Sequence, residues 1–401
     1  MRMRFSLSCV AIALIVFAGC KPKSEAVPDL IIHNAKVLTV DKDFRVAEAV
    51  AIRGEQILDV GSNDRILALA GEGTTRYDAG GKMVLPGLMD SHLHAVSSAM
   101  FEFDHEVPEM QTIADVLAYV KSRAATLGPG KWVNVSQVFI TRLKDQRYPT
   151  RAELDEAAPE NPAVFRTGPD ASLNTLALKE SGIDRNFTVS DGSPCRVEKD
   201  AKGDPTGILR QCERFIKSVD SNRKPTEAET LEWVKKLLAD YNSVGITSVG
   251  DGDTSDSELE IYRKLWKNNE LSVRVFATVS VNAQDPIEKI EERIRTAAKD
   301  PLHTYNNMLW LRGAKVFLDG GMLTGSAYML KPWGVSKIYS ITDPEYRGMR
   351  YIEPDKLVRI LRVSLENGLQ LAAHSQGDAA VTTYVDAVEQ LSKSGVNTVA
   401  A

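Results

Sequence analysis

Apolar and polar positions follow two different periods in the second half of the chain. Longer stretches with apolar residues at helical spacing predict helices over residues 226–243, 256–268, 287–298, 354–367 and 379–393. Shorter runs that are rich in apolar residues predict strands over residues 246–251, 273–279, 311–320 and 369–374. Parallel strands that are covered by helices on both faces have this continuous apolar character. The pattern therefore predicts α/β architecture of the TIM-barrel type.

The first half of the chain has a different organisation. Segments 30–40 and 49–61 are rich in β-forming residues and are bounded by turn residues. They predict strands in the N-terminal part of a composite β-sandwich, which we place at residues 29–84. The stretch from about residue 100 to 223 does not alternate cleanly between strand and helix. We interpret it as a cap that is inserted into the barrel region, residues 85–401.

Residues 1–20 predict a secretory signal. Two arginines precede an apolar run over residues 5–17, which is too short to span a bilayer, and Ala-Gly-Cys follows. A cysteine in this place resembles the lipidated cysteine of a bacterial lipobox. We therefore expect an exported protein that Cys20 anchors to a membrane, facing the periplasm or the exterior, through a polar tether at residues 21–28. The alternative is a signal that is cleaved elsewhere, which gives a soluble exported protein.

The composition narrows the class of partner. Of the 401 residues, 43% are hydrophobic and 26% are charged, as in ordinary globular chains, and the net charge is −5. A negative net charge indicates no basic surface for nucleic acid, so nucleic acid is excluded as a partner. We expect a small-molecule substrate, and the sequence does not indicate an oligomeric state.

The most informative motif is a pair of histidines, His92 and His94, at the end of an apolar run with a Pro-Gly break. Residues at i and i+2 of a strand point to the same face, so the pair is able to offer two imidazoles to one metal ion. The plainer interpretation is two histidines on a wet strand face. A third histidine, His374, also ends a predicted strand, and catalytic groups of TIM-type barrels lie at the C-terminal strand ends.

Lys315 lies late in another predicted strand, among apolar neighbours. A lysine is rarely buried without a partner or a chemical task. The alternative is a lysine whose amine reaches solvent near the strand end.

The sequence around these residues resembles the amidohydrolase superfamily, and amidohydrolase family 3 in particular. Residues 85–90, Leu-Pro-Gly-Leu-Met-Asp, resemble the opening barrel strand of the superfamily, and residues 313–320 resemble the lysine strand of family 3. His374, with a Gly-Asp pair after it, resembles the histidine of strand five. Further matches follow in family order at residues 151–155, 174–178, 203–209 and 245–248.

The resemblance implies a metal-dependent hydrolase that cleaves non-peptide C–N bonds in amides, formamides or cyclic amides. It implies that His92, His94, His374 and Lys315 bind a divalent metal, expected as two zinc ions, with carbon dioxide held as a carbamate on the lysine. Metal ions in such sites activate water and polarise a carbonyl group. In the superfamily a strand-six histidine completes the ligands and a strand-eight aspartate moves the proton.

Two residues are candidates for substrate contact. Family members often have Asp-Gly-His where this chain has Gly168-Pro169-Asp170, so Asp170 is a substitute for that histidine. The glycine-rich segment 320–327 follows the lysine strand at the active-site face, which makes Gly320 a candidate in a loop over the site.

Cys195 and Cys212 flank two β-type segments that are joined by turn residues near Gly203. A hairpin there places the two cysteines opposite each other, and in an exported protein they are able to form a disulfide. Hairpin register is hard to derive from sequence, so the unpaired alternative stays open.

Counting from His92, the chain encodes five of the eight strands of a closed barrel, and 27 residues follow His374. Each further β/α unit needs about 30 residues. We therefore expect an incomplete barrel, in a truncated member of the family that lacks the strand-six histidine and the strand-eight aspartate, so the catalytic residue is unknown. The alternative function is an inactive lipoprotein fragment that binds metal or ligand without turnover. A mononuclear site is a third possibility.

Overall fold

The computed structural model describes residues 27–136, 138–190, 195–219 and 222–399. These residues divide into two compact units between Gly87 and Leu88. The expected signal and Cys20 lie outside the described residues. No helix in the described part of the chain is both long and apolar enough to span a membrane.

The N-terminal unit contains two small sheets with the strand orders β5-β4-β1-β6 and β3-β2-β7. Its elements are β1 (Leu30–His33), β2 (Lys36–Leu38), β3 (Val46–Ala47), β4 (Ala49–Arg53), β5 (Gln56–Gly61), α1 (Asn63–Leu67), β6 (Thr75–Asp78) and β7 (Met83–Val84). Val37 of one sheet and Val50 of the other belong to one buried cluster. The strands expected in this region are therefore present, and the composite sandwich stays a prediction.

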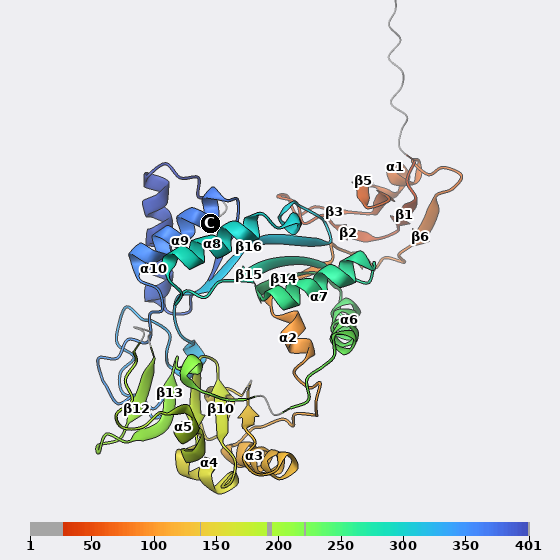
Figure 1. Cartoon of the computed structure of the whole chain (residues 1–401). Helices are drawn as coiled ribbons and strands as arrows, with labels where there is room; N and C mark the ends of the chain where they lie inside the picture. The colour runs from red at the N-terminus through yellow and green to blue at the C-terminus, as the bar shows by residue number, and fades with distance from the viewer. Residues whose placement is uncertain (1–26, 137, 191–194, 220–221, 400–401) are drawn as a thin grey trace, which may run out of the picture. The chain divides into compact units, whose positions relative to one another are not determined.

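The second unit is built on a parallel sheet with the strand order β17-β16-β15-β14-β8. Its strands are β8 (Leu88–Leu93), β14 (Ile246–Thr254), β15 (Arg274–Ser280), β16 (Leu309–Phe317) and β17 (Gln370–His374). Every neighbouring pair is parallel. The sheet curls into half a barrel, with β8 and β17 as its edge strands in the described part of the chain (Figure 1). Five strands are the number that the count from His92 predicts.

Helices flank this sheet and share one hydrophobic core with it (Figure 1). They are α2 (Ala95–Ala99), α6 (Glu227–Ser243), α7 (Asp256–Lys267), α8 (Ile287–Ala298), α9 (Pro354–Glu366) and α10 (Asp378–Lys393). The predicted helix boundaries are confirmed to within one residue.

Helix α7 shows why the helical pattern was readable. Ser255 and Glu258 form a reciprocal capping box that satisfies N–H groups at the helix start. Leu259, Tyr262 and Leu265 recur at helical spacing and are buried against the sheet.

The cap is a separate mixed region with a five-stranded sheet of order β12-β13-β11-β10-β9. Its elements are α3 (Ile113–Leu127), β9 (Val133–Val135), η1 (Ile140–Arg142), α4 (Arg151–Ala157), β10 (Ala163–Thr167), β11 (Asp170–Leu173), α5 (Thr175–Ser181), β12 (Arg196–Lys199), β13 (Pro205–Arg210) and η2 (Glu213–Phe215). Strands β12 and β13 form the expected hairpin, and a disulfide joins Cys195 to Cys212. Two short turns, η3 (Pro301–His303) and η4 (Met322–Thr324), lie in the barrel region.

Candidate active site

The histidine pair lies at the C-terminal end of β8. His92 is within the strand and His94 follows it directly, at the start of α2. Their ring centroids are 5.3 Å apart and the rings are nearly perpendicular, at 79°. Burial lowers the pKa of His92, and the nearby Lys315 and His374 lower it further. A lowered pKa keeps the imidazole neutral at neutral pH, which leaves a nitrogen lone pair for a metal ion.

Residues of β14, the strand next to β8 in the sheet, lie against the rings of both His92 and His94. The buried Asp251 carboxylate accepts hydrogen bonds from the Tyr262 hydroxyl at 2.5 Å and from the Ala95 N–H at 3.3 Å. Its other oxygen lies 3.9 Å from Nδ1 of His94. Gly252 lies against the His92 ring so closely that a Cβ there would be 2.8 Å from Cε1 and 3.0 Å from Nδ1.

Replacement of Gly252 with alanine is therefore expected to displace the His92 imidazole. The added methyl group needs space that the ring occupies, and a shift of the ring by a few tenths of an ångström misaligns its nitrogen. We expect metal affinity and kcat/KM to fall by about 10- to 100-fold. The matched control is Gly73→Ala, because a Cβ at Gly73 meets nothing within 4 Å. Equal metal affinity in the two variants would show that Gly252 does not position His92.

Lys315 is buried, with only 2% of its surface exposed, in a stretch of β16 whose neighbours are apolar. Burial lowers the pKa of Lys315, and the carboxylate of Asp253 on β14 opposes that shift. The ammonium nitrogen lies 5.2 Å from the centre of the Phe317 ring. A lysine with a lowered pKa has a larger fraction of neutral amine, which is the form that reacts with carbon dioxide.

His374 ends β17, the strand next to β16, with Phe317 as its register partner. The rings of His374 and Phe317 lie 5.3 Å apart at an angle of 32°. Burial lowers the pKa of His374, while Asp319 and a hydrogen bond with the Gly320 backbone oppose the shift. A backbone partner of this kind orients the ring and selects its tautomer.

Curling of the sheet brings its two edges toward one cavity. In a flat sheet, four spacings of about 4.8 Å would separate β8 from β17 by about 19 Å. In the curled sheet His92, His94 and His374 line the same cavity of about 720 Å³. The other lining residues are Phe139, Gly168, Pro169, Gln211, Ser280, Val281, Asn282, Ala283, Gln284, Phe317, Asp319, Gly321, Leu323, Thr324, Tyr351 and Gln376.

Asp319 shapes the part of the cavity that follows the lysine strand. Its fully buried carboxylate accepts hydrogen bonds from the backbone N–H groups of Tyr328, Gln376 and Gly377, at 2.9, 3.0 and 2.8 Å. The carboxylate thereby ties the loop after β16 to the loop after β17. Sequence reasoning missed this role, since the three donors come from segments far apart in the chain.

The comparisons with known proteins agree with this geometry. The sequence pattern of the amidohydrolase family matches residues 76–399. The chain belongs to the amidohydrolase family. An N-substituted formamide deformylase of Arthrobacter pascens is 28% identical to this amidohydrolase over 375 residues, which are 90% of this chain and 66% of the relative. A putative amidohydrolase of Bacillus subtilis is 24% identical, over 89% of this chain and 65% of the relative.

The chain thus spans less than two thirds of the length of either curated relative. Among solved structures, an uncharacterized metal-dependent hydrolase of Pyrococcus furiosus aligns with a TM-score of 0.58 and 21% identity. That alignment covers 90% of this chain and 70% of the other, and it shows that the two share a fold.

The structure places the two expected substrate contacts of this amidohydrolase outside the cavity lining. Asp170 is 1% exposed and forms an ion pair of 3.3 Å with the fully buried Arg210 of β13. It lies behind the wall that Pro169 and Gln211 form, because the antiparallel pairing of β11 with β13 sets Asp170 opposite Arg210. Gly320 is buried as well, while its neighbours Asp319 and Gly321 line the cavity.

The donor groups of the site are of chemical types that bind divalent metals. It offers three imidazoles, the Lys315 amine, and an Asp253 carboxylate oxygen that is buried without a hydrogen-bond partner among the described residues. Nitrogen and anionic oxygen are the ligand types that zinc prefers. No group of three or more His, Cys, Asp or Glu side chains in the described ranges is placed closely enough to hold an ion by itself. Lys315 lies between the two histidine strands in the sheet order and is the group that would join them.

Asp253 is a further residue of this site that sequence reasoning did not identify. It is separated from Asp251 by one residue, a spacing that signals a shared strand face, yet β14 has irregular register at both ends of this segment. Register shifts of this kind change which side chains face the sheet interior, and they are not visible in the residue pattern.

Proposed function

We propose that this amidohydrolase is a metal-dependent hydrolase of non-peptide C–N bonds, acting on neutral amides, formamides or cyclic amides. The observation that carries the proposal is one cavity that holds three histidines from both edges of the half-barrel, next to a buried lysine. The relationship to a formamide deformylase supports the same bond type.

In this proposal His92, His94, His374 and a carboxylated Lys315 hold two zinc ions. When bound, the metal supplies Lewis acidity for the substrate carbonyl and an activated water as nucleophile. The chain positions these ligands through Asp251, Gly252 and the Gly320 backbone.

The cavity wall supports a substrate without net charge. Aromatic and aliphatic side chains, among them Phe139, Leu323 and Tyr351, offer an apolar surface to the substituent of the amide. Neutral amides such as Gln211 and Asn282 offer hydrogen bonds for its polar end. No lysine or arginine lines this cavity within the described ranges. An anionic substituent would meet no lysine or arginine there, and its desolvation would be unfavourable.

Metal removal tests the proposal. Dialysis of the purified chain against a chelator is expected to abolish hydrolysis of an N-alkyl formamide, and added zinc is expected to restore it. The measurements are formate release and metal content by mass spectrometry, with about two ions per chain in the active form. Equal rates in the metal-free protein would contradict a metal-dependent reaction. Bound metal without hydrolysis of any formamide, amide or cyclic amide would favour a binding protein without turnover.

We also propose that the protein is exported and anchored to a membrane through a lipid on Cys20. The support is the sequence pattern of residues 1–20. Metabolic labelling with a fatty acid is expected to mark the wild type and not a Cys20→Ala variant, and equal labelling would contradict the anchor.

A further inference from the structure

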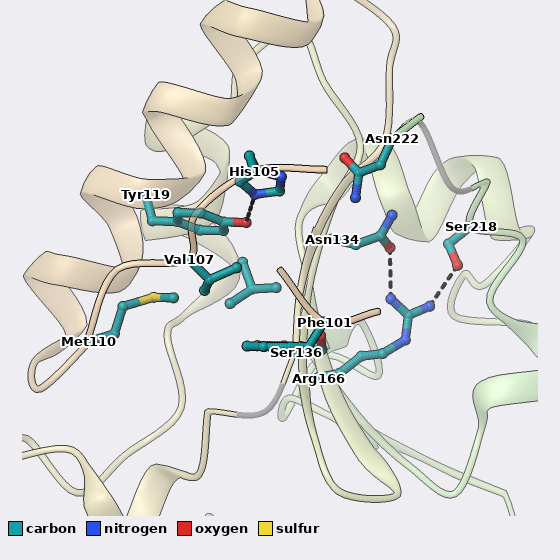
Figure 2. A pocket seen from close by; sticks show the side chains of 11 residues that line it. Phe101, His105, Val107, Met110, Tyr119, Asn134, Ser136, Arg166, Ser218 and Asn222 are labelled. Atoms are coloured by element: carbon teal, nitrogen blue, oxygen red, sulfur yellow. Dashed lines mark hydrogen bonds between the residues drawn. The ribbon is translucent and has the colours of Figure 1, made fainter. Parts of the chain in front are cut away.

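A second pocket lies in the cap, apart from the histidine cavity. It has a volume of about 380 Å³ and is formed by the segment after α2, by α3, by the ends of β9 and β10, and by the return segment to α6 (Figure 2). The two pockets have no lining residue in common. Its lining residues are Phe101, His105, Val107, Met110, Tyr119, Asn134, Val135, Ser136, Arg166, Ser218 and Asn222.

Arg166 is the central charged residue of this pocket. Its side chain is only 19% exposed. Nε and one terminal nitrogen donate hydrogen bonds to Glu213, and the same terminal nitrogen also donates to Ser218 Oγ at 2.6 Å. The other terminal nitrogen donates to Asn134 Oδ1 at 2.7 Å. In Figure 2 the polar ends of Asn134 and Ser218 both point toward the guanidinium of Arg166.

These contacts leave donors for a ligand on the pocket side. A guanidinium has five N–H groups, and the hydrogen bonds within the described residues use four of those of Arg166. The fifth N–H and the hydroxyls of Ser136 and Ser218 are all donors at this wall. Glu213, which balances the charge of Arg166, is 61% exposed, so water screens its negative charge. The positive potential of the guanidinium is therefore stronger toward the pocket than toward solvent.

The opposite wall carries His105, whose two ring nitrogens both lie within hydrogen-bond distance of other side chains. His105 Nδ1 lies 3.1 Å from the Asp104 carboxylate, which also accepts from Arg123, and His105 Nε2 lies 2.7 Å from the Tyr119 hydroxyl. Burial raises the pKa of Tyr119, so the phenol keeps its proton. Both imidazole nitrogens therefore already have a partner within the protein.

The rest of this wall is apolar. Val107 and Met110 lie beside Tyr119 in Figure 2, and Phe101 and Val135 complete the apolar lining. Phe101 is 39% exposed, so its ring is accessible to a ligand. No aspartate or glutamate lines the pocket within the described ranges.

We infer that this cap pocket is a second binding site, for a small organic monocarboxylate with an aromatic or aliphatic part. The carboxylate accepts from Arg166 and the two serine hydroxyls, and the apolar part contacts Phe101, Val107 and Met110. A guanidinium with neighbouring hydroxyls is a typical carboxylate site, and the volume is in the range of pockets for small organic ligands. Binding here needs neither metal nor hydrolysis, so the inference stands apart from the proposed function.

The position of the pocket connects it to the histidine cavity. Arg166 is two residues before Gly168, which lines that cavity at the end of the same strand. A ligand on Arg166 therefore contacts a strand whose end forms part of the other wall.

Calorimetric titration of the metal-free full chain with benzoate, and with benzyl alcohol as its neutral analogue, tests the inference. We expect benzoate to bind at least about tenfold more tightly than benzyl alcohol, because the ionised group is the one that Arg166 recognises. The variant Arg166→Gln is expected to lose at least about tenfold in benzoate affinity. Equal affinity for the two ligands, or no heat of binding at millimolar benzoate, would overturn the inference.

Further variants protect the test against a loss of folding. Phe101→Ala changes an exposed ring without polar partners and is expected to weaken both ligands. Arg185→Gln is the matched control, since Arg185 is an exposed cap arginine that is paired with Asp204. Phe317→Ala alters the histidine cavity and is expected to leave benzoate affinity unchanged. If Phe317→Ala weakens benzoate while Phe101→Ala does not, the ligand occupies the other cavity and the inference is wrong.

Discussion

Replacement of Lys315 with methionine is expected to abolish hydrolysis and to leave the fold intact. Methionine has a similar length and shape but cannot form a carbamate, so the link proposed between the two histidine strands is lost. We expect kcat/KM to fall by at least about a thousandfold, with loss of the bound metal. Metal content and formate release in purified protein are the measurements, and the exposed Lys331→Met is the control.

Stability distinguishes this effect from unfolding. Burial lowers the pKa of Lys315 from its ordinary value of 10.5, so the protonated amine is unfavourable in the folded protein. The unfolded chain binds the proton more tightly, and the metal-free wild type therefore gains stability as the pH rises toward 10.5. Methionine removes this cost, so the variant is expected to be as stable as the wild type at pH 7 or up to about 2 kcal/mol more stable.

Urea unfolding at pH 7 and pH 10 measures the free energy of unfolding of the metal-free wild type and of Lys315→Met. The advantage of the variant is expected to shrink at the higher pH. A Lys315→Glu variant, which supplies a carboxylate in place of the carbamate, is expected to retain more metal than the methionine variant. Full activity of Lys315→Met would remove the lysine from the proposed site.

Replacement of Asp170 with alanine is expected to destabilise the cap and not to act through the substrate. Burial raises the pKa of Asp170 to about 6, so the side chain is ionised at pH 7.5 and faces the guanidinium of Arg210. Alanine removes one partner of a fully buried ion pair and leaves Arg210 with Glu198, at 2.7 Å, as its acidic partner. Breaking such a pair costs about 3–5 kcal/mol.

The free energy of unfolding of Asp170→Ala measures this cost directly. Asp204→Ala is the matched control, because it breaks an exposed ion pair in the same cap and is expected to cost less than about 1 kcal/mol. The conservative Asp170→Asn keeps an acceptor for the backbone N–H of Gln211, which lies 3.2 Å away. Its loss of stability is therefore expected to lie between those of Asp170→Ala and Asp204→Ala. A raised KM with unchanged stability in Asp170→Ala would instead indicate contact with the substrate.

Most of the secondary structure of the second unit was predictable, since its helices and strands have clean periods and clear ends. The helix caps at Thr226 and Ser255 follow from Ser/Thr-x-x-Glu patterns that the chain itself displays. The cap was harder to predict, since two of the four strand pairings in its sheet, β9 with β10 and β11 with β13, join segments far apart in the sequence. The pairing of β11 with β13 decides the environment of Asp170, and no local pattern signals it.

In the candidate site, too, some residues were predictable from local sequence, and others have roles that depend on distant segments. The proximity of His92 and His94 was predictable, because the two residues are close in sequence at one strand end. The sequence also favoured a buried Lys315, since its neighbours in β16 are apolar. The roles of Asp253 and Asp319 were not predictable, since their partners lie on other strands and loops. His105 lies in a hydrogen-bonded wall of the cap pocket, and its partner Tyr119 is 14 residues away in the chain.

By itself the sequence determined the order of strands and helices, the resemblance to amidohydrolases and the types of side chain at the strand ends. The tertiary structure alone decided that two edge strands face one cavity, that Asp170 pairs with Arg210, and that the cap has its own pocket. The physical reason is the range of the interactions. Periodicity and capping act within a few residues, whereas sheet curvature and the partner of a buried charge depend on segments that meet only after folding.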